Sequence, residues 1–95
     1  MADKITRFDI ADHLHGDDDV QAFLDETAQH GDASDFIHAL GIAARARGMT
    51  TVAKQAGLTR ASLYKSLAAN GNPEFATVLK VTRALGLRLH VVTGG

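Results

Sequence analysis

Four glycines, at positions 31, 48, 57 and 86, divide this chain into segments that are each long enough for one or two short helices. Within the segments, apolar residues recur at intervals of three and four, which is the spacing of a helix that buries one face. Glycine often follows the last turn of a helix because it adopts backbone angles that other residues avoid. The sequence therefore predicts a mainly α fold of five helices around one hydrophobic core.

Two helices are expected in the first half of the chain. The first begins at the acidic run 17–19 and ends near residue 30. Its apolar face comprises Val20, Phe23 and Leu24. The second begins at a cap formed by Asp32 or Ser34 and ends before the glycine at position 48. Its apolar stripe comprises Phe36, Ile37, Leu40 and Ala44.

Two short helices are expected to follow in quick succession. Thr50 or Thr51 caps the first, which ends at Ala56, and Thr59 caps the second, which ends near Ala69. Small hydroxyl side chains suit these positions because they accept hydrogen bonds from the unpaired amides of a first helical turn.

The last expected helix follows a turn signal at residues 70–73. Pro73 suits a first helical turn because its φ is fixed, and Glu74 suits the positive end of the helix dipole. The expected buried side comprises Phe75, Val78, Leu79, Thr82 and Leu85.

Residues 87–93 alternate apolar and polar side chains at first and are β-branched at the end, which favours a short C-terminal β-strand. A lone strand leaves its backbone N–H and C=O groups unpaired. Its partner is expected to be either residues 5–14, an extended or irregular segment, or the same strand of a second copy. The second arrangement predicts a homodimer.

Charge is divided unevenly along the chain. Residues 1–35 hold ten acidic side chains against two basic ones, a net charge of −8. Residues 36–95 hold eight basic side chains against one acidic one, a net charge of +7. The basic part suits a polyanion, and the acidic part suits a basic protein or an autoinhibitory contact. Two ordinary solvated faces are the alternative.

The segment 52–67 has the features of a helix-turn-helix motif. A small residue, Ala53, allows two helices to cross closely, and Gly57 suits the turn because it tolerates a positive φ. Leu58 and Leu63 have the spacing needed to hold the second helix against the core. The alternative is an ordinary helical hairpin. The motif predicts a DNA-binding protein whose helix starting near Thr59 enters the major groove.

Exposed residues of this motif have the chemistry of DNA contacts. The candidate DNA-binding residues are Thr50, Thr51, Thr59, Arg60, Ala61, Ser62, Tyr64, Lys65 and Asn70. The threonines begin helices and suit phosphate contacts. Arg60 can pair with guanine, Ala61 can contact a thymine methyl group, and Lys65 can reach guanine or phosphate. The alternatives are a solvated helix face for Arg60 and Lys65, and a partly buried core position for Tyr64.

The stretch from Phe36 to Leu89 resembles the Xre-type, lambda-repressor-like helix-turn-helix domains. Within that class the chain resembles the addiction-module antidote (antitoxin) proteins. The residues that carry this resemblance are Ala39-Leu40-Gly41, Ala43, Gly48-Met49, Leu63-Tyr64-Lys65, Gly71-Asn72-Pro73 and Ala84-Leu85-Gly86-Leu87. One departure is Ser66, where the motif usually has an aliphatic residue. Leu67 is expected to supply the packing instead.

The resemblance implies an antitoxin of a type II toxin-antitoxin module. Such a protein binds a cognate basic toxin of the RelE/ParE-like class and represses its own operon by binding double-stranded operator DNA. We divide the chain accordingly into an acidic N-terminal segment, residues 1–32, with one short helix, and a helix-turn-helix DNA-binding domain with the C-terminal strand, residues 33–95. The acidic residues between 9 and 35 could cover the positive active site of such a toxin.

Other classes of function are not expected. The chain has no cysteine and no phosphate-loop, nucleophile-elbow or zinc-protease motif, so we expect neither an enzyme nor a cofactor. His13 and His15 alone make a weak metal site. No secretory signal or apolar span is present in the sequence, which favours a cytoplasmic protein without membrane contact. Two alternatives remain open: a stand-alone Xre-type transcriptional regulator, and a protein-interaction adaptor.

Overall fold

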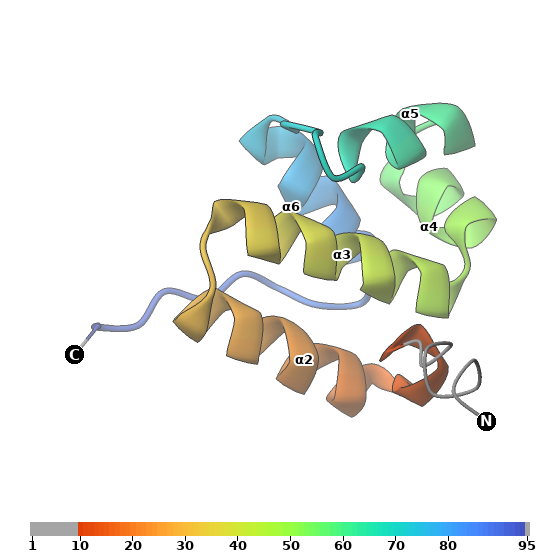
Figure 1. Ribbon diagram of the computed structural model, residues 1–95. Coiled ribbons are helices and arrows are strands. Elements are labelled where there is room, and N and C mark those ends of the chain that lie inside the picture. The colour runs from red at the N-terminus through yellow and green to blue at the C-terminus, as the bar shows by residue number, and fades with distance from the viewer. Residues whose placement is uncertain (1–9, 95) are drawn as a thin grey trace, which may run out of the picture.

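The computed structural model describes residues 10–94, and these form five α-helices preceded by one 3-10 helix (Figure 1). The elements are η1 (Ile10–His13), α2 (Asp17–His30), α3 (Ala33–Arg47), α4 (Met49–Ala56), α5 (Arg60–Ser66) and α6 (Phe75–Ala84). The mainly helical fold with five helices is therefore confirmed. None of the helices in this range combines the length and apolar content needed to span a bilayer.

Helices α2 and α3 begin and end close to where local signals predict. Helix α2 has three acidic residues in its first turn, where negative charge interacts favourably with the helix dipole. Helix α3 begins at Asp32, whose Oδ1 accepts a hydrogen bond of 2.9 Å from the backbone N–H of Asp35. The Asp35 carboxylate accepts one of 3.1 Å from the N–H of Asp32. This reciprocal capping box settles the choice between Asp32 and Ser34.

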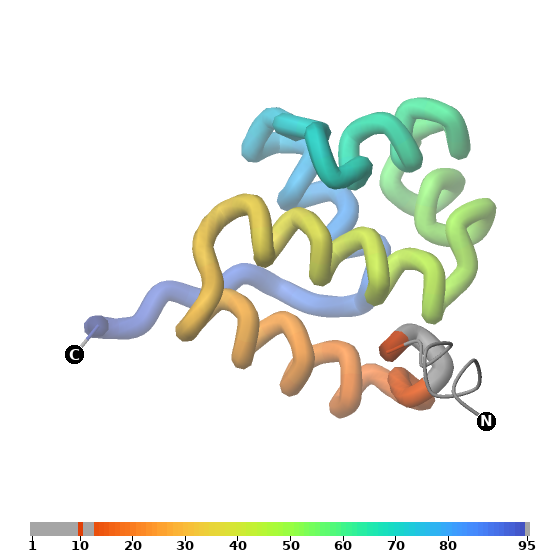
Figure 2. The backbone as a smooth tube through the Cα atoms, viewed as in Figure 1, coloured from red at the N-terminus to blue at the C-terminus, as the bar shows by residue number. Residues whose placement is uncertain are grey.

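Helix α3 is central to the molecule. Figures 1 and 2 show it between α2 on one side and the group α4–α6 on the other, and it contacts α2, α4, α6 and η1. One core joins all of these helices. Its buried members are Val20, Leu24, Ala39, Leu40, Ala43, Ala44, Met49, Val52, Ala53, Ala56, Leu63, Leu67, Val81, Ala84 and Leu85. The core is thus made of aliphatic side chains and small alanines, which allow the helices to approach closely.

The predicted C-terminal strand is not seen in the single chain, where residues 87–94 form no helix or strand. A strand requires a neighbour with which to exchange backbone hydrogen bonds. Residues 10–13 of the expected partner segment instead form η1, and residues 5–9 lie outside the described range. Because this segment has no partner strand in the single chain, several of its apolar side chains are exposed.

The expected caps of α4 are also wrong. Thr50 and Thr51 lie within its first turn, and Gly48 stands at the junction as both the last cap of α3 and the first cap of α4. Gly48 has φ +115°, a backbone conformation that residues with a Cβ rarely adopt. A single residue therefore turns the chain from one helix into the next.

Two further helix ends differ from expectation. Helix α5 ends at Ser66 rather than near Ala69, because the chain then folds back so tightly that a Cβ at Gly71 would lie 2.4 Å from the Ser66 carbonyl oxygen. Helix α6 begins at Phe75 rather than Pro73. Phe75 is 66% exposed, so its predicted burial is wrong. The buried residues of α6 and its C-cap begin six residues after Phe75 and comprise Val81, Thr82, Ala84 and Leu85.

Candidate nucleic-acid interface

Helices α4 and α5 are joined by a three-residue turn that begins at Gly57. Gly57 adopts the left-handed conformation, with φ +72° and ψ +30°, as its place in the motif predicts. The backbone N–H of Leu58 donates a hydrogen bond of 2.9 Å to the carbonyl oxygen of Ala53. Thr59 then caps α5, because its Oγ1 accepts a hydrogen bond of 3.0 Å from the N–H of Ser62. The glycine and the threonine together fix the direction in which α5 leaves the turn.

The inner side of α5 is packed against the core. Leu63 is fully buried, Leu67 is buried, and Leu58 is half-buried against the same cluster. Ser66, which occupies the usual aliphatic position, is only half-buried. Leu67 supplies the packing that Ser66 cannot, as the sequence predicts. These contacts orient the opposite side of α5 toward solvent.

All nine candidate DNA-binding residues are exposed. Thr50 and Thr51 lie in the first turn of α4, and Thr59 lies at the cap of α5. Arg60, Ala61 and Ser62 follow in the first turn of α5, Tyr64 and Lys65 lie in its second turn, and Asn70 lies in the connection to α6. The structure therefore leaves these residues free to contact a large ligand. Their contact with DNA itself stays a prediction.

Arg60 and Tyr64 form a pair on the exposed side of α5. The Arg60 guanidinium carbon lies 5.5 Å from the centre of the Tyr64 ring, within the range of a cation–π contact. Arg60 Nη2 also donates a hydrogen bond of 3.3 Å to the Tyr64 hydroxyl. Tyr64 is 45% exposed and is not a member of the hydrophobic core cluster. The aromatic ring restricts the rotamers of the guanidinium and so holds it in an orientation before any ligand binds.

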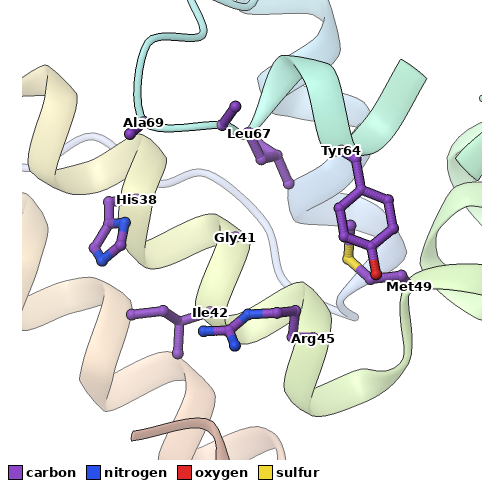
Figure 3. Close-up of a pocket in the computed structure, with 9 residues that line it drawn as sticks. His38, Gly41, Ile42, Arg45, Met49, Tyr64, Leu67 and Ala69 are labelled. Carbon is purple, nitrogen blue, oxygen red and sulfur yellow. The ribbon is translucent and has the colours of Figure 1, made fainter. Parts of the chain in front are cut away.

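A groove with a volume of about 300 Å³ separates α5 from the outer side of α3 (Figure 3). Tyr64 and Leu67 line one wall, and His38, Ile42 and Arg45 line the other. Sequence reasoning did not select His38 or Arg45. The signal for them was their spacing of seven residues, which places both on the side of α3 that also carries Ile42. Their proximity to α5 depends on tertiary packing and is not visible in the sequence.

A second charged surface lies on α2. Its exposed carboxylates belong to Asp17, Asp18, Asp19, Asp25 and Glu26. Arg47 of α3 forms an ion pair with Asp17, and Glu26 lies 3.7 Å from His30 Nε2. We call these five carboxylates the acidic face of α2. Among the residues described, no group of three or more histidine, cysteine or carboxylate side chains is placed to hold a metal ion.

Comparison with known proteins gives two matches. Residues 4–93 match the model of a family described as "Probable addiction module antidote protein". An uncharacterised protein of Haemophilus influenzae is 43% identical over 91 residues, covering 96% of this chain and 94% of the relative. No solved structure matches the chain. Because the family model spans nearly all of the residues, this chain belongs to the addiction-module antidote family.

Proposed function

We propose that this protein is the antitoxin of a type II toxin-antitoxin module, which binds a cognate RelE/ParE-like toxin and represses its own operon as a homodimer. Membership of the antidote family supports the antitoxin role. The observation that carries the DNA-binding part is the division of α5 into two sides: Leu63 and Leu67 are buried, and Arg60, Ala61 and Lys65 are exposed.

In this proposal α5 enters the major groove of operator DNA. Arg60 donates two hydrogen bonds to O6 and N7 of a guanine, Ala61 contacts a thymine methyl group, and Lys65 reaches a guanine or a phosphate. Thr50 and Thr51, at the start of α4, donate hydrogen bonds to phosphate oxygens and position the motif. The net charge of +7 over residues 36–95 favours association with the phosphate backbone.

The acidic face of α2 supports the toxin-binding part of the proposal. Ten carboxylates within residues 1–35 repel DNA, so they do not assist the DNA-binding function. They attract a basic protein, and a toxin that cleaves or binds nucleic acid has a basic surface. Occupation of that surface by carboxylates excludes nucleic acid from it. We place the protein in the cytoplasm, where both proposed partners are made, and assign it no enzymatic activity of its own.

Two measurements test the proposal. The first is co-expression with the small basic protein encoded by the adjacent gene, followed by affinity purification through a tag on one protein and then, separately, on the other, to test whether the two proteins purify together. The second is titration of the DNA upstream of its operon, compared with a scrambled duplex of the same length and composition. We expect a complex in the first measurement and preferential binding to the upstream DNA in the second.

The outcomes separate this proposal from the other functions. Operator binding without a toxin complex indicates a stand-alone Xre-type regulator and contradicts the antitoxin role. A toxin complex without preference for the upstream DNA indicates a protein-interaction adaptor and contradicts the repressor role. A matched control is the Arg60→Ala variant, which should lose preference for the upstream DNA and keep the toxin complex.

A further inference from the structure

The C-terminal segment, residues 87–94, exposes apolar side chains that the fold does not use. Leu89 is 47% exposed, Val91 93% and Val92 72%. The beginning of the segment is attached to the helices: Leu87 packs against the core, and its N–H donates a hydrogen bond of 3.1 Å to the carbonyl oxygen of Thr82. Within the described part of the chain, no hydrogen bond holds residues 88–94. Figures 1 and 2 show the end of the segment projecting beyond the helices.

The side chains of this segment alternate in a way that suits a strand with one apolar face. In an extended strand, successive side chains point to opposite faces. One face then carries Leu87, Leu89 and Val91, and the other carries Arg88, His90 and Val92. The apolar face is continuous with the core, because Leu87 already packs there. Unpaired backbone groups and an exposed apolar stripe are the two properties of an edge that accepts another strand.

We propose that residues 87–94 pair with the same segment of a second copy, as a two-stranded antiparallel ribbon centred on His90. This inference deepens the proposed function, because it names the interface of the homodimer on which that function rests. A two-fold axis perpendicular to the ribbon keeps the apolar stripes of both copies on one face. With His90 opposite its symmetry mate, Leu89 of each copy lies opposite Val91 of the other.

The register centred on His90 creates more apolar pairs than the one centred on Val91. It creates two direct pairs between Leu89 and Val91, and cross-strand pairs of this kind are the main stabilising unit of a sheet. A register centred on Val91 creates only one apolar pair, Val91 with itself, and places Leu89 opposite Thr93. A register centred on Leu89 would use Leu87 as the cross-strand partner of Val91, but Leu87 already packs against the core of its own chain. The His90 register also places each Arg88 opposite Val92 of the other copy, so the two like charges do not face each other directly.

A second copy of the chain suits this segment better than the other binding partners that could be considered. Residues 10–13 of the same chain cannot add a strand, because they form η1. A basic protein is disfavoured, because residues 75–95 contain three basic side chains and no acidic one. Self-pairing requires no partner chemistry beyond the apolar stripe that the segment itself presents. In such a dimer, both paired segments have free backbone hydrogen-bonding groups before the two copies meet, so no existing strand pairing has to be broken.

The absence of cysteine from the sequence allows a direct test of the register. Single-cysteine variants at positions 88–92 of the full chain are oxidised under identical mild conditions, and the disulfide-linked dimer is quantified. Directly opposite residues have Cα atoms about 4.5–5.5 Å apart, within the range of about 4.4–6.8 Å that a disulfide requires. Diagonal neighbours are about 7–8 Å apart, beyond that range. The His90→Cys variant should therefore cross-link several-fold more than Leu89→Cys or Val91→Cys. Lys80→Cys, at an exposed position on α6, is the matched control.

Sedimentation equilibrium of the cysteine-free chain tests the dimer itself. We expect a dimer at tens of micromolar, and we expect Val91→Lys to raise its dissociation constant at least tenfold while Val91→Thr raises it less. A monomeric parent chain, a Val91→Lys variant that remains fully dimeric, or equal cross-linking at all five positions would overturn the proposal. Maximal cross-linking at position 89 or at position 91 would overturn the His90 register.

Failure of this interface is distinguishable from failure of the proposed function. A duplex that carries a single half-site is contacted by one protomer. The affinity of the Val91→Lys variant for such a duplex therefore does not depend on the ribbon. If the ribbon forms but no variant binds upstream DNA, the DNA-binding function fails and the interface stands. If upstream DNA is bound by a chain that stays monomeric, the interface fails and the DNA-binding function stands.

Discussion

Arg47, in the last turn of α3, donates a hydrogen bond of 3.2 Å from Nη2 to the carbonyl oxygen of Leu85, at the C-terminal end of α6. The same nitrogen contacts the carboxylate of Asp17, in the first turn of α2. One guanidinium thus joins three helices and supplies positive charge to a helix end whose carbonyl groups lack intrahelical partners. The acidic and basic parts of the chain are held together at this point.

The contact with Leu85 should be worth more than the ion pair with Asp17. The Asp17 side chain is 69% exposed, so water and salt screen the ion pair, whereas the Arg47 side chain is only 31% exposed. We expect Arg47→Met to lower the free energy of unfolding by about 1–3 kcal/mol. Asp17→Asn should lower it by less than about 1 kcal/mol. Urea denaturation followed by circular dichroism measures both, and Lys80→Met, at an exposed position, controls for the loss of one positive charge. Equal losses for Arg47→Met and Asp17→Asn would assign the effect to the ion pair.

The packing of α5 depends on Leu67 rather than Ser66. Leu67→Ala removes most of a buried side chain and should lower the free energy of unfolding by about 2–5 kcal/mol. Ser66→Ala, one residue earlier and half-buried, should change it by less than about 1 kcal/mol. Thermal unfolding of both variants provides the comparison. The assigned orientation of α5 is wrong if Ser66→Ala is the more destabilising of the two.

Arg60 should determine DNA sequence preference, with Tyr64 as its support. Arg60→Ala should reduce the preference for upstream over scrambled duplex by about 1–3 kcal/mol. Tyr64→Phe keeps the ring contact and loses only the hydrogen bond to the hydroxyl, so it should have a smaller effect than Tyr64→Leu, which loses both. Fluorescence anisotropy with labelled duplexes at two salt concentrations gives these values. An unchanged preference in Arg60→Ala excludes Arg60 from base recognition.

The acidic face of α2 should contribute to toxin binding. Asp18→Lys combined with Asp25→Lys reverses two exposed charges and leaves the Asp17–Arg47 pair intact. We expect toxin affinity, measured by calorimetry, to fall at least tenfold, because attraction becomes repulsion. Glu74→Lys, an exposed charge reversal at the start of α6, should leave it nearly unchanged. If toxin affinity is the same in the double variant and in the parent protein, the acidic face is not the toxin contact.

Local signals in the sequence predicted much of this fold. The ends of α2 and α3 follow from acidic first turns, the Asp32 cap and the glycines after each helix, all of which act within a few residues. Gly57 and Thr59 defined the turn before α5 for the same reason. All nine candidate DNA-binding residues are exposed, and for those on α5 the apolar spacing of the helix already identified its inner side.

Features that depend on distant residues were missed. The contact between Arg47 and Leu85 joins positions 38 residues apart, and no periodic pattern reports it. The strand at residues 87–93 had the correct composition, but a strand forms only with a partner, and the sequence does not show whether one is present. Phe75 lies on the same helix face as the buried Thr82, seven residues later, and is nevertheless exposed, because it is the first residue of α6 and precedes the buried part of that helix.

Gly48 has a consequence for engineering this protein. Since this residue ends α3 and begins α4, the connection has no spare length, and an inserted residue would rotate the whole α4–α5 unit relative to α2. The connection between α5 and α6 spans residues 67–74, and its exposed residues Ala69 and Asn70 precede the tightly packed Gly71. A fluorophore or affinity tag for studies of toxin binding or assembly is therefore better placed at the exposed Asn70 than at the junction formed by Gly48.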